Sequence, residues 1–199
     1  MNILIVLLGI IIFFIALLFF RTMRFRDHST AVEPIPAISI HETQIAHHLS
    51  EVVQIQSVSK VDAADVDQQP FIMMRDWIAK TFPLLSSELE RTVINEYSLL
   101  YKWKGTENKL DPVLFNAHMD VVTVEEETLN EWNSAPFSGE IKDGYIWGRG
   151  TLDMKNQLIA LLETVEGLLK EGYTPLSERF IWRLAMMKKS WGFMGQRRY

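Results

Sequence analysis

Two short stretches of the sequence carry side chains that can do chemistry together. The first, "AHMDVV", places His118 and Asp120 two residues apart at the end of an expected buried strand. Because side chains alternate between the two faces of a strand, both should point to the same face. An imidazole in that position can bind a metal ion, and the carboxylate beside it can orient the ring through its other nitrogen. Taken alone, the stretch is explained equally well by a structural His–Asp pair.

The second stretch, "DGYIWGRGTLDMK", places Asp153 three residues after a glycine turn formed by Gly148 and Gly150. In α/β sheets, loops at the carboxyl ends of strands are where ligands bind. The Asp153 carboxylate can cap the helix that follows. It can also bridge two metal ions, which lie about 3.5–4 Å apart in two-metal hydrolytic sites.

The elements that must position these side chains alternate between strands and helices, which predicts an α/β sheet domain. Apolar residues at helical spacing predict helices, the last of which should end at Gly172. Runs of β-branched and aromatic residues predict strands. The expected helices cover residues 41–55, 71–82 and 152–172, and the expected strands lie within residues 91–105, 111–122, 143–150 and 177–184. Three further histidines, His41, His47 and His48, lie in or beside the first helix and are interpreted as solvated or capping residues.

The N-terminal run, residues 3–20, contains no charge and no strongly polar group. A bilayer core needs about 20 apolar residues as a helix, so the run is just long enough to span it. A cleavable signal peptide would have a shorter apolar region after a basic start, so we interpret residues 1–26 as an uncleaved transmembrane anchor with a basic flank. Residues 27–40, which contain two prolines, predict a linker. The arginines after the run favour a cytoplasmic domain, but the side of the membrane stays open.

The composition excludes several classes of protein. The formal net charge is -5, which argues against nucleic acid as a partner because phosphate binding needs a basic surface. There is no cysteine, which excludes a disulfide scaffold, a Cys-ligated zinc ion and a thiol nucleophile. Hydrophobic residues make up 48% of the chain, enough for a packed core.

Taken together, the motifs resemble a known family. "NAHMDVV", followed by "W…PFSG.I.DGYIWGRGTLD.K", is similar to the carboxypeptidase S and aminoacylase-like branch of the co-catalytic di-zinc peptidases and amidohydrolases, and the resemblance covers about residues 40–181. It implies that residues 41–182 are the N-terminal part of a zinc-peptidase-like catalytic domain, a mixed sheet flanked by helices. It also implies that His118 is a ligand to one zinc ion, that Asp120 orients and polarises His118, and that Asp153 bridges two Zn²⁺ ions. A cis peptide bond between Asp153 and Met154 is implied as well.

The resemblance further implies metal-assisted hydrolysis of peptides or N-acyl amino acid amides, with homodimers in intact members of the family. Such an enzyme needs a Glu-Glu pair after the next strand, one Glu as general base and one as zinc ligand, and further ligands beyond it. Here "RFIWRL" leads into "AMMKKSWGF". The resemblance therefore predicts an enzyme by lineage, truncated and inactive as this chain, in which zinc binding is weak or absent.

The C-terminal residues 183–199 predict an out-of-frame tail. Met and Lys have so few codons that "MMKK", read in a shifted frame, contains Asp and Glu codons, and "RLAMMKK" can encode Phe-Gly-His-Asp-Glu-Glu. The alternative is a divergent but genuine C-terminus. In that case the chain would be a non-catalytic, membrane-tethered interaction module that retains the fold.

Overall fold

The computed structural model describes residues 3–25, 40–60, 62–106, 110–175 and 179–185, the last range as backbone. The chain divides into two units, residues 1–40 and residues 41–199. The predicted linker, apart from Ile40, lies outside the described residues, and so do residues 186–199 of the predicted tail.

The first unit contains one helix, α1 (Ile3–Met23), over the predicted apolar run. Residues 3–20 of this helix are apolar on every side, and none of its 21 residues is buried. Near its end the Arg24 guanidinium lies over the Phe20 ring, 4.8 Å from the ring centre. By length and composition α1 can cross a membrane, a test that a signal sequence near the N-terminus also passes. The helix is confirmed, and its insertion into a membrane stays a prediction.

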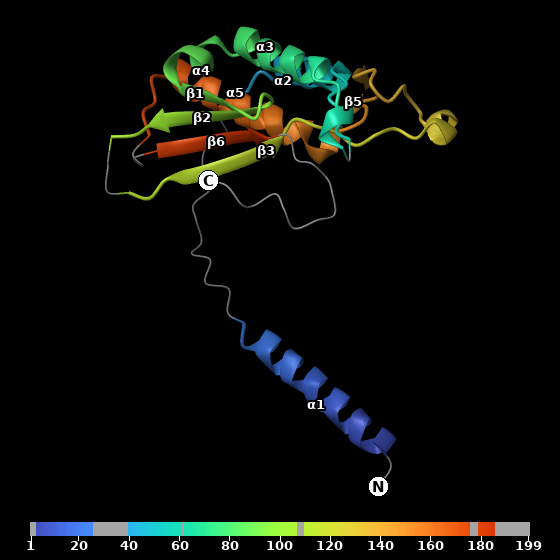
Figure 1. Ribbon diagram of the computed structural model, residues 1–199. Helices are drawn as coiled ribbons and strands as arrows, with labels where there is room; N and C mark the ends of the chain where they lie inside the picture. The colour runs from blue at the N-terminus through green and yellow to red at the C-terminus, as the bar shows by residue number, and fades with distance from the viewer. Residues whose placement is uncertain (1–2, 26–39, 61, 107–109, 176–178, 186–199) are drawn as a thin grey trace. The chain divides into compact units, whose positions relative to one another are not determined.

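The second unit is built on a mixed four-stranded sheet in the order β1-β2-β6-β3. The strands are β1 (Glu90–Ile94), β2 (Ser98–Lys104), β3 (Val113–His118) and β6 (Arg179–Ala185). β1 and β6 each pair antiparallel with β2, whereas β3 pairs parallel with β6. Among the described residues of this unit, four helices lie on one face of the sheet (Figure 1). They are α2 (Glu42–Gln54), α3 (Gln69–Thr81), α4 (Pro83–Glu88) and α5 (Asn156–Lys170). The predicted α/β class with a mixed sheet is confirmed.

Smaller elements complete the second unit. A two-stranded hairpin, β4 (Glu140–Lys142) with β5 (Tyr145–Trp147), precedes the glycine turn. Short 3-10 turns cover Ala63–Asp65 and Glu126–Glu131. The short helix α4 was not predicted from the sequence. It is anchored from α5, because the buried Glu166 carboxylate accepts the backbone N–H groups of Leu84 and Leu85.

The core lies between the helices and the sheet. In β2 the side chains alternate as expected, and Leu99, Tyr101 and Trp103 are buried. They face the apolar stripes of the helices, which follow the helical spacing of the sequence. The buried helical residues of this cluster are Val52, Met74, Ile78, Leu85, Leu158, Ile159, Leu162 and Val165.

Two sequence expectations need correction. The strand that carries His118 was expected to be buried, but Val113 to Asn116 are exposed, with Leu114 at 59%, and only Ala117 and His118 are buried. The reason is that β3 is the outer strand of the sheet, whereas a buried strand needs neighbours on both sides. The last helix was expected from residue 152 but begins at Asn156, because Asp153 and Met154 have non-helical backbone angles. The bond between them is cis, as the resemblance implied.

Candidate metal centre

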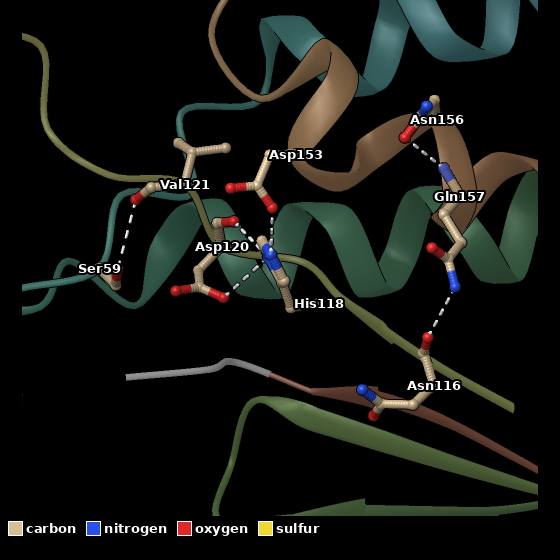
Figure 2. Close-up of polar contacts among 8 residues, drawn as sticks. All are labelled: Ser59, Asn116, His118, Asp120, Val121, Asp153, Asn156 and Gln157. Carbon is tan, nitrogen blue, oxygen red and sulfur yellow. Dashed lines mark hydrogen bonds and ion pairs between the residues drawn. The ribbon is translucent and has the colours of Figure 1, made fainter. Parts of the chain in front are cut away.

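The structure brings His118, Asp120 and Asp153 together at the end of β3 (Figure 2). His118 Nδ1 lies 2.8 Å from the Asp120 carbonyl oxygen and 3.4 Å from its carboxylate Oδ1. His118 Nε2 lies 3.1 Å from Asp153 Oδ1. His118 and Asp120 are buried, whereas the Asp153 side chain is exposed. Asp120 and Asp153 therefore both contact His118, and the three predicted residues form one group.

The hydrogen bonds determine which ring nitrogen faces the solvent side. A carbonyl oxygen only accepts, so Nδ1 must carry a proton and donate it to Asp120. In the neutral ring Nε2 is then an acceptor, and it faces another acceptor, the Asp153 carboxylate. Two acceptors at this distance need a proton or a cation between them.

The electrostatics of the site agree with this assignment. The pKa of His118 is raised above its ordinary value, mainly because the Asp120 carboxylate accepts a hydrogen bond from the ring, with Asp153 adding to the effect. Burial opposes the rise, since it penalises the charged imidazolium. A metal ion binds the neutral ring through Nε2, so it competes with a proton for the nitrogen that faces the Asp153 carboxylate.

The residues present fit part of a zinc site. Imidazole nitrogen and carboxylate oxygen are ordinary zinc ligands with bonds of about 2.0–2.2 Å, and the two atoms are close enough to share one ion. Within the described ranges, however, no group of three or more metal-ligating side chains that could hold an ion is present. The described residues thus provide two donors, His118 and Asp153, and further donors have to come from elsewhere.

The tight glycine turn before Asp153 packs closely against Val121 and Val53. A Cβ added to Gly150 would lie 2.2 Å from Val121 Cγ1, and one added to Gly148 would lie 2.4 Å from Val53 Cγ1. Both glycines have positive φ values, +83° and +154°, which other residues rarely adopt. The two glycines that the sequence singled out are therefore required for close approach as well as for the turn.

We expect Gly150→Ala to destabilise the domain by several kcal/mol, because it combines backbone strain with a clash against Val121. Gly144→Ala is the matched control, since Gly144 has a similar φ of +79° but nothing within 4 Å of an added Cβ. Gly144→Ala should cost only about 1 kcal/mol. Urea unfolding of both variants measures the difference, and equal losses of stability would contradict the close approach.

A cavity of about 960 Å³ opens beside the three residues. His118, Asp120 and Asp153 line it together with Trp132 and Arg149. The Arg149 guanidinium lies over the Trp132 ring, 5.1 Å from the ring centre. Sequence reasoning did not single out this pair, although both residues fall inside the quoted family motif. Their separation of 17 positions matches no strand or helix period that would signal a contact.

Lys155 is a second residue that the sequence analysis missed. Its side chain is fully buried, and its Nζ donates to the carbonyl oxygens of Val52 and Ile55 at the end of α2. Burial lowers the pKa of Lys155 to about 7, and the Asp120 carboxylate opposes this effect. The signals in the sequence were its position two residues after Asp153 and its place as the last residue of the quoted family motif.

Of the other histidines, His41 and His47 are exposed as expected, whereas the expectation was wrong for His48, which is half-buried and neither solvated nor capping. His48 on α2 hydrogen-bonds the Glu163 carboxylate and packs edge-on against Phe82. His47 is exposed, and His41 stands at the start of α2 without a side-chain cap. None of them lines the cavity beside His118.

Comparisons with known proteins agree with the motifs. Residues 114–181 match the family model described as Peptidase family M20/M25/M40. The chain is 34% identical over 179 residues to Probable carboxypeptidase S-like 2 of Dictyostelium discoideum, covering 86% of this chain and 34% of that protein. It is 40% identical over 139 residues to Carboxypeptidase S of Saccharomyces cerevisiae, covering 69% of this chain and 24% of that protein.

Two further relatives extend the comparison. The N-fatty-acyl-amino acid synthase/hydrolase PM20D1 of Xenopus tropicalis is 38% identical over 143 residues, with 69% of this chain and 27% of that protein covered. The crystal structure of human carnosine dipeptidase 1 shares the fold with a TM-score of 0.55 and 22% identity, over 71% of this chain and 32% of that chain.

The chain spans about a third or less of the length of these relatives. The matched segment nevertheless includes both candidate ligands, His118 and Asp153. Residues 114–181 therefore belong to the Peptidase family M20/M25/M40, and the predicted resemblance to its carboxypeptidase S-like members is confirmed.

Proposed function

We propose that this chain carries the N-terminal, metal-binding part of a zinc-dependent metallopeptidase or amidohydrolase that cleaves peptide or N-acyl amino acid amide bonds. One observation carries the proposal: His118 Nε2 faces the Asp153 carboxylate at 3.1 Å while Nδ1 donates to Asp120. The names of the relatives, a carboxypeptidase and an N-fatty-acyl-amino acid synthase/hydrolase, support the substrate class.

Each residue has a role in this proposal. His118 and Asp153 would hold zinc, with Asp153 shared between two ions. Asp120 keeps Nδ1 protonated and so presents the Nε2 lone pair outward, which is the usual outer-shell arrangement of zinc-binding histidines. When bound, zinc would supply a Lewis acid that lowers the pKa of a water molecule and polarises the amide carbonyl.

The cavity supports an amide substrate of moderate size. It is lined by the candidate ligands on one side and by Trp132, Trp147 and Arg149 on another. The aromatic rings can pack against an apolar part of a substrate, and a guanidinium can pair with a carboxylate such as that of an amino acid. We propose further that α1 anchors the protein in a membrane, because its side chains are apolar on every face and none is buried.

The test is zinc content and amide hydrolysis of the purified full chain in mild detergent, with a dipeptide and an N-acyl amino acid as substrates. We expect measurable but weak zinc binding, because the described residues supply only two donors. We expect hydrolysis to be slow or undetectable, because two donors would hold a zinc ion only weakly.

The outcome also decides the alternative function. Zinc binding that depends on His118 supports the metallopeptidase lineage with or without hydrolysis. A folded chain that binds no zinc at any accessible concentration would overturn the proposal. The non-catalytic, membrane-tethered interaction module would then be favoured, since α1 and the folded domain do not depend on zinc.

A further inference from the structure

The two candidate ligands come from segments that do not pair with each other. His118 ends β3, and Asp153 lies in the turn before α5, yet their side chains meet at 3.1 Å. Both segments are fastened to residues 52–59, which run from the last turn of α2 to a β-bridge at Val58. We propose that Ser57 and Lys155 are positioning residues that set the separation of His118 and Asp153 through this shared stretch, an inference that rests on the metal-binding role proposed above.

Ser57 fastens the segment that carries His118. Its hydroxyl donates to the carbonyl oxygen of Met119 at 2.6 Å, and both residues are completely buried. Met119 stands between His118 and Asp120. The bond therefore fixes the peptide group between Met119 and Asp120, which lies between the candidate ligand and the residue that orients it.

A short parallel ladder reinforces this contact. Val121 N–H donates to the Ser57 carbonyl at 2.8 Å, and Ser59 N–H donates to the Val121 carbonyl at 2.9 Å. The Ser59 side chain adds a longer hydrogen bond to Val121 O, 3.3 Å, which Figure 2 shows beside the site. The ladder holds the chain just after Asp120, whereas the Ser57 hydroxyl reaches between the two functional residues.

Lys155 fastens the segment that carries Asp153. Its Nζ donates to the carbonyl oxygens of Val52 and Ile55 at 2.8 and 2.7 Å. Its own backbone N–H donates to the Gly150 carbonyl at 2.9 Å, which closes the turn around Asp153. The lysine is only two residues from Asp153, so its anchoring restricts where the carboxylate can lie.

One carbonyl group, that of Ile55, connects the contacts of Lys155 with those of Ser57. Ile55 O accepts from Lys155 Nζ and also from the backbone N–H of Ser57 at 2.9 Å. The route from Asp153 to His118 therefore runs through Lys155, Ile55, Ser57 and Met119 by consecutive hydrogen bonds and peptide units. Each of these residues is buried, so water does not compete for the bonds.

The choice of a lysine argues for positioning rather than for stability alone. The last carbonyl groups of a helix are commonly satisfied by a glycine cap or by water, and burying an amine is costly. At the end of α2 the carbonyl groups instead accept hydrogen bonds from the Lys155 side chain, which lies about 100 positions later, next to the turn that carries Asp153. The arrangement links the helix end to the site in a way that a local cap would not.

The test compares four variants of the full chain. Ser57→Ala and Lys155→Met remove the two anchoring groups. Ser87→Ala is the control for Ser57, because it removes an exposed hydroxyl on α4 that bonds only the Leu84 carbonyl oxygen, and Lys170→Met is the control for Lys155 at the exposed end of α5. Zn²⁺ affinity is measured by competition with a chromophoric chelator, and the ring nitrogen resonances of His118 are measured by NMR on ¹⁵N-histidine-labelled, metal-free protein. Near-ultraviolet circular dichroism establishes that each variant is folded.

We expect Ser57→Ala and Lys155→Met each to weaken Zn²⁺ binding about tenfold, as loss of a supporting hydrogen bond does at other zinc sites, and to shift the His118 resonances. The two controls should match the unaltered chain in both measurements. Equal affinity and equal resonances for Ser57→Ala and Ser87→Ala would overturn the proposal. If the unaltered chain binds no Zn²⁺, the proposed function fails, and the metal-free resonances still decide the positioning role. If Lys155→Met does not fold, Ser57→Ala decides alone.

Discussion

Replacing His118 by Ala is expected to lower zinc affinity by more than about 100-fold, which exceeds the range typical of losing an outer-shell partner. The physical reason is that Nε2 is one of only two donors within the described residues, so its loss leaves a single carboxylate. Asp120→Asn should have a smaller effect, about 10- to 100-fold, because it removes the charge behind Nδ1 but leaves both donors. Equilibrium dialysis with Zn²⁺ measures both affinities.

His47→Ala is the matched control for this experiment. His47 lies exposed on α2 and does not line the cavity, so its removal should leave zinc affinity unchanged. Retention of full affinity in His118→Ala would refute the assignment of the site. A loss in His47→Ala as large as that in His118→Ala would indicate adventitious binding to surface histidines instead.

The second large effect concerns α1. A chain that lacks residues 1–25 is expected to move from the membrane pellet to the supernatant after alkaline carbonate extraction, whereas the full chain stays in the pellet. The helix offers an apolar run over residues 3–20 with no buried side chain, and a bilayer is the solvent that covers such a surface. The folded unit of residues 41–199 carries no part of α1, so its circular dichroism should be preserved.

Two further observations make this result specific. Replacing Ile11 and Ile15 together by Lys keeps the length of the helix but adds two charges at its centre, each costing about 2.5–3.5 kcal/mol on insertion scales, and should also release the chain. The mass of the membrane-bound protein should match an intact N-terminus. A mature chain that begins after the apolar run would instead identify a cleaved signal peptide and contradict the predicted anchor.

The predictable part of the fold is the part encoded by local periodicity. α2 and α5 carry apolar residues at helical spacing, and β2 alternates so regularly that Leu99, Tyr101 and Trp103 are all buried. The candidate site was predictable for a related reason. His118 and Asp120 sit two positions apart at a strand end, and the glycine turn before Asp153 follows another strand.

The parts that were not predicted depend on neighbours rather than on spacing. An apolar run such as Val113 to Phe115 has the same pattern in a buried strand and at a sheet edge, and only the strand order β1-β2-β6-β3 distinguishes the two. The start of α5 was predicted too early, because Asp153 and Met154 are compatible with a helix by type but lie in a turn held by tertiary contacts. The contacts of Ser57 and Lys155 span 62 and about 100 positions, which no local pattern reveals.

Those long separations have a consequence for the order in which the protein is made. During synthesis β3 and its His118 emerge well before Lys155, yet the α2 carbonyl groups that Lys155 binds have emerged about 100 residues earlier still. Contacts between distant parts of a chain form slowly because the intervening loop must be ordered first. His118 and Asp120 therefore leave the ribosome as an unfinished pair, and the geometry around His118 is completed only when the chain has been translated past α5 and through β6, whose Ala185 pairs with His118.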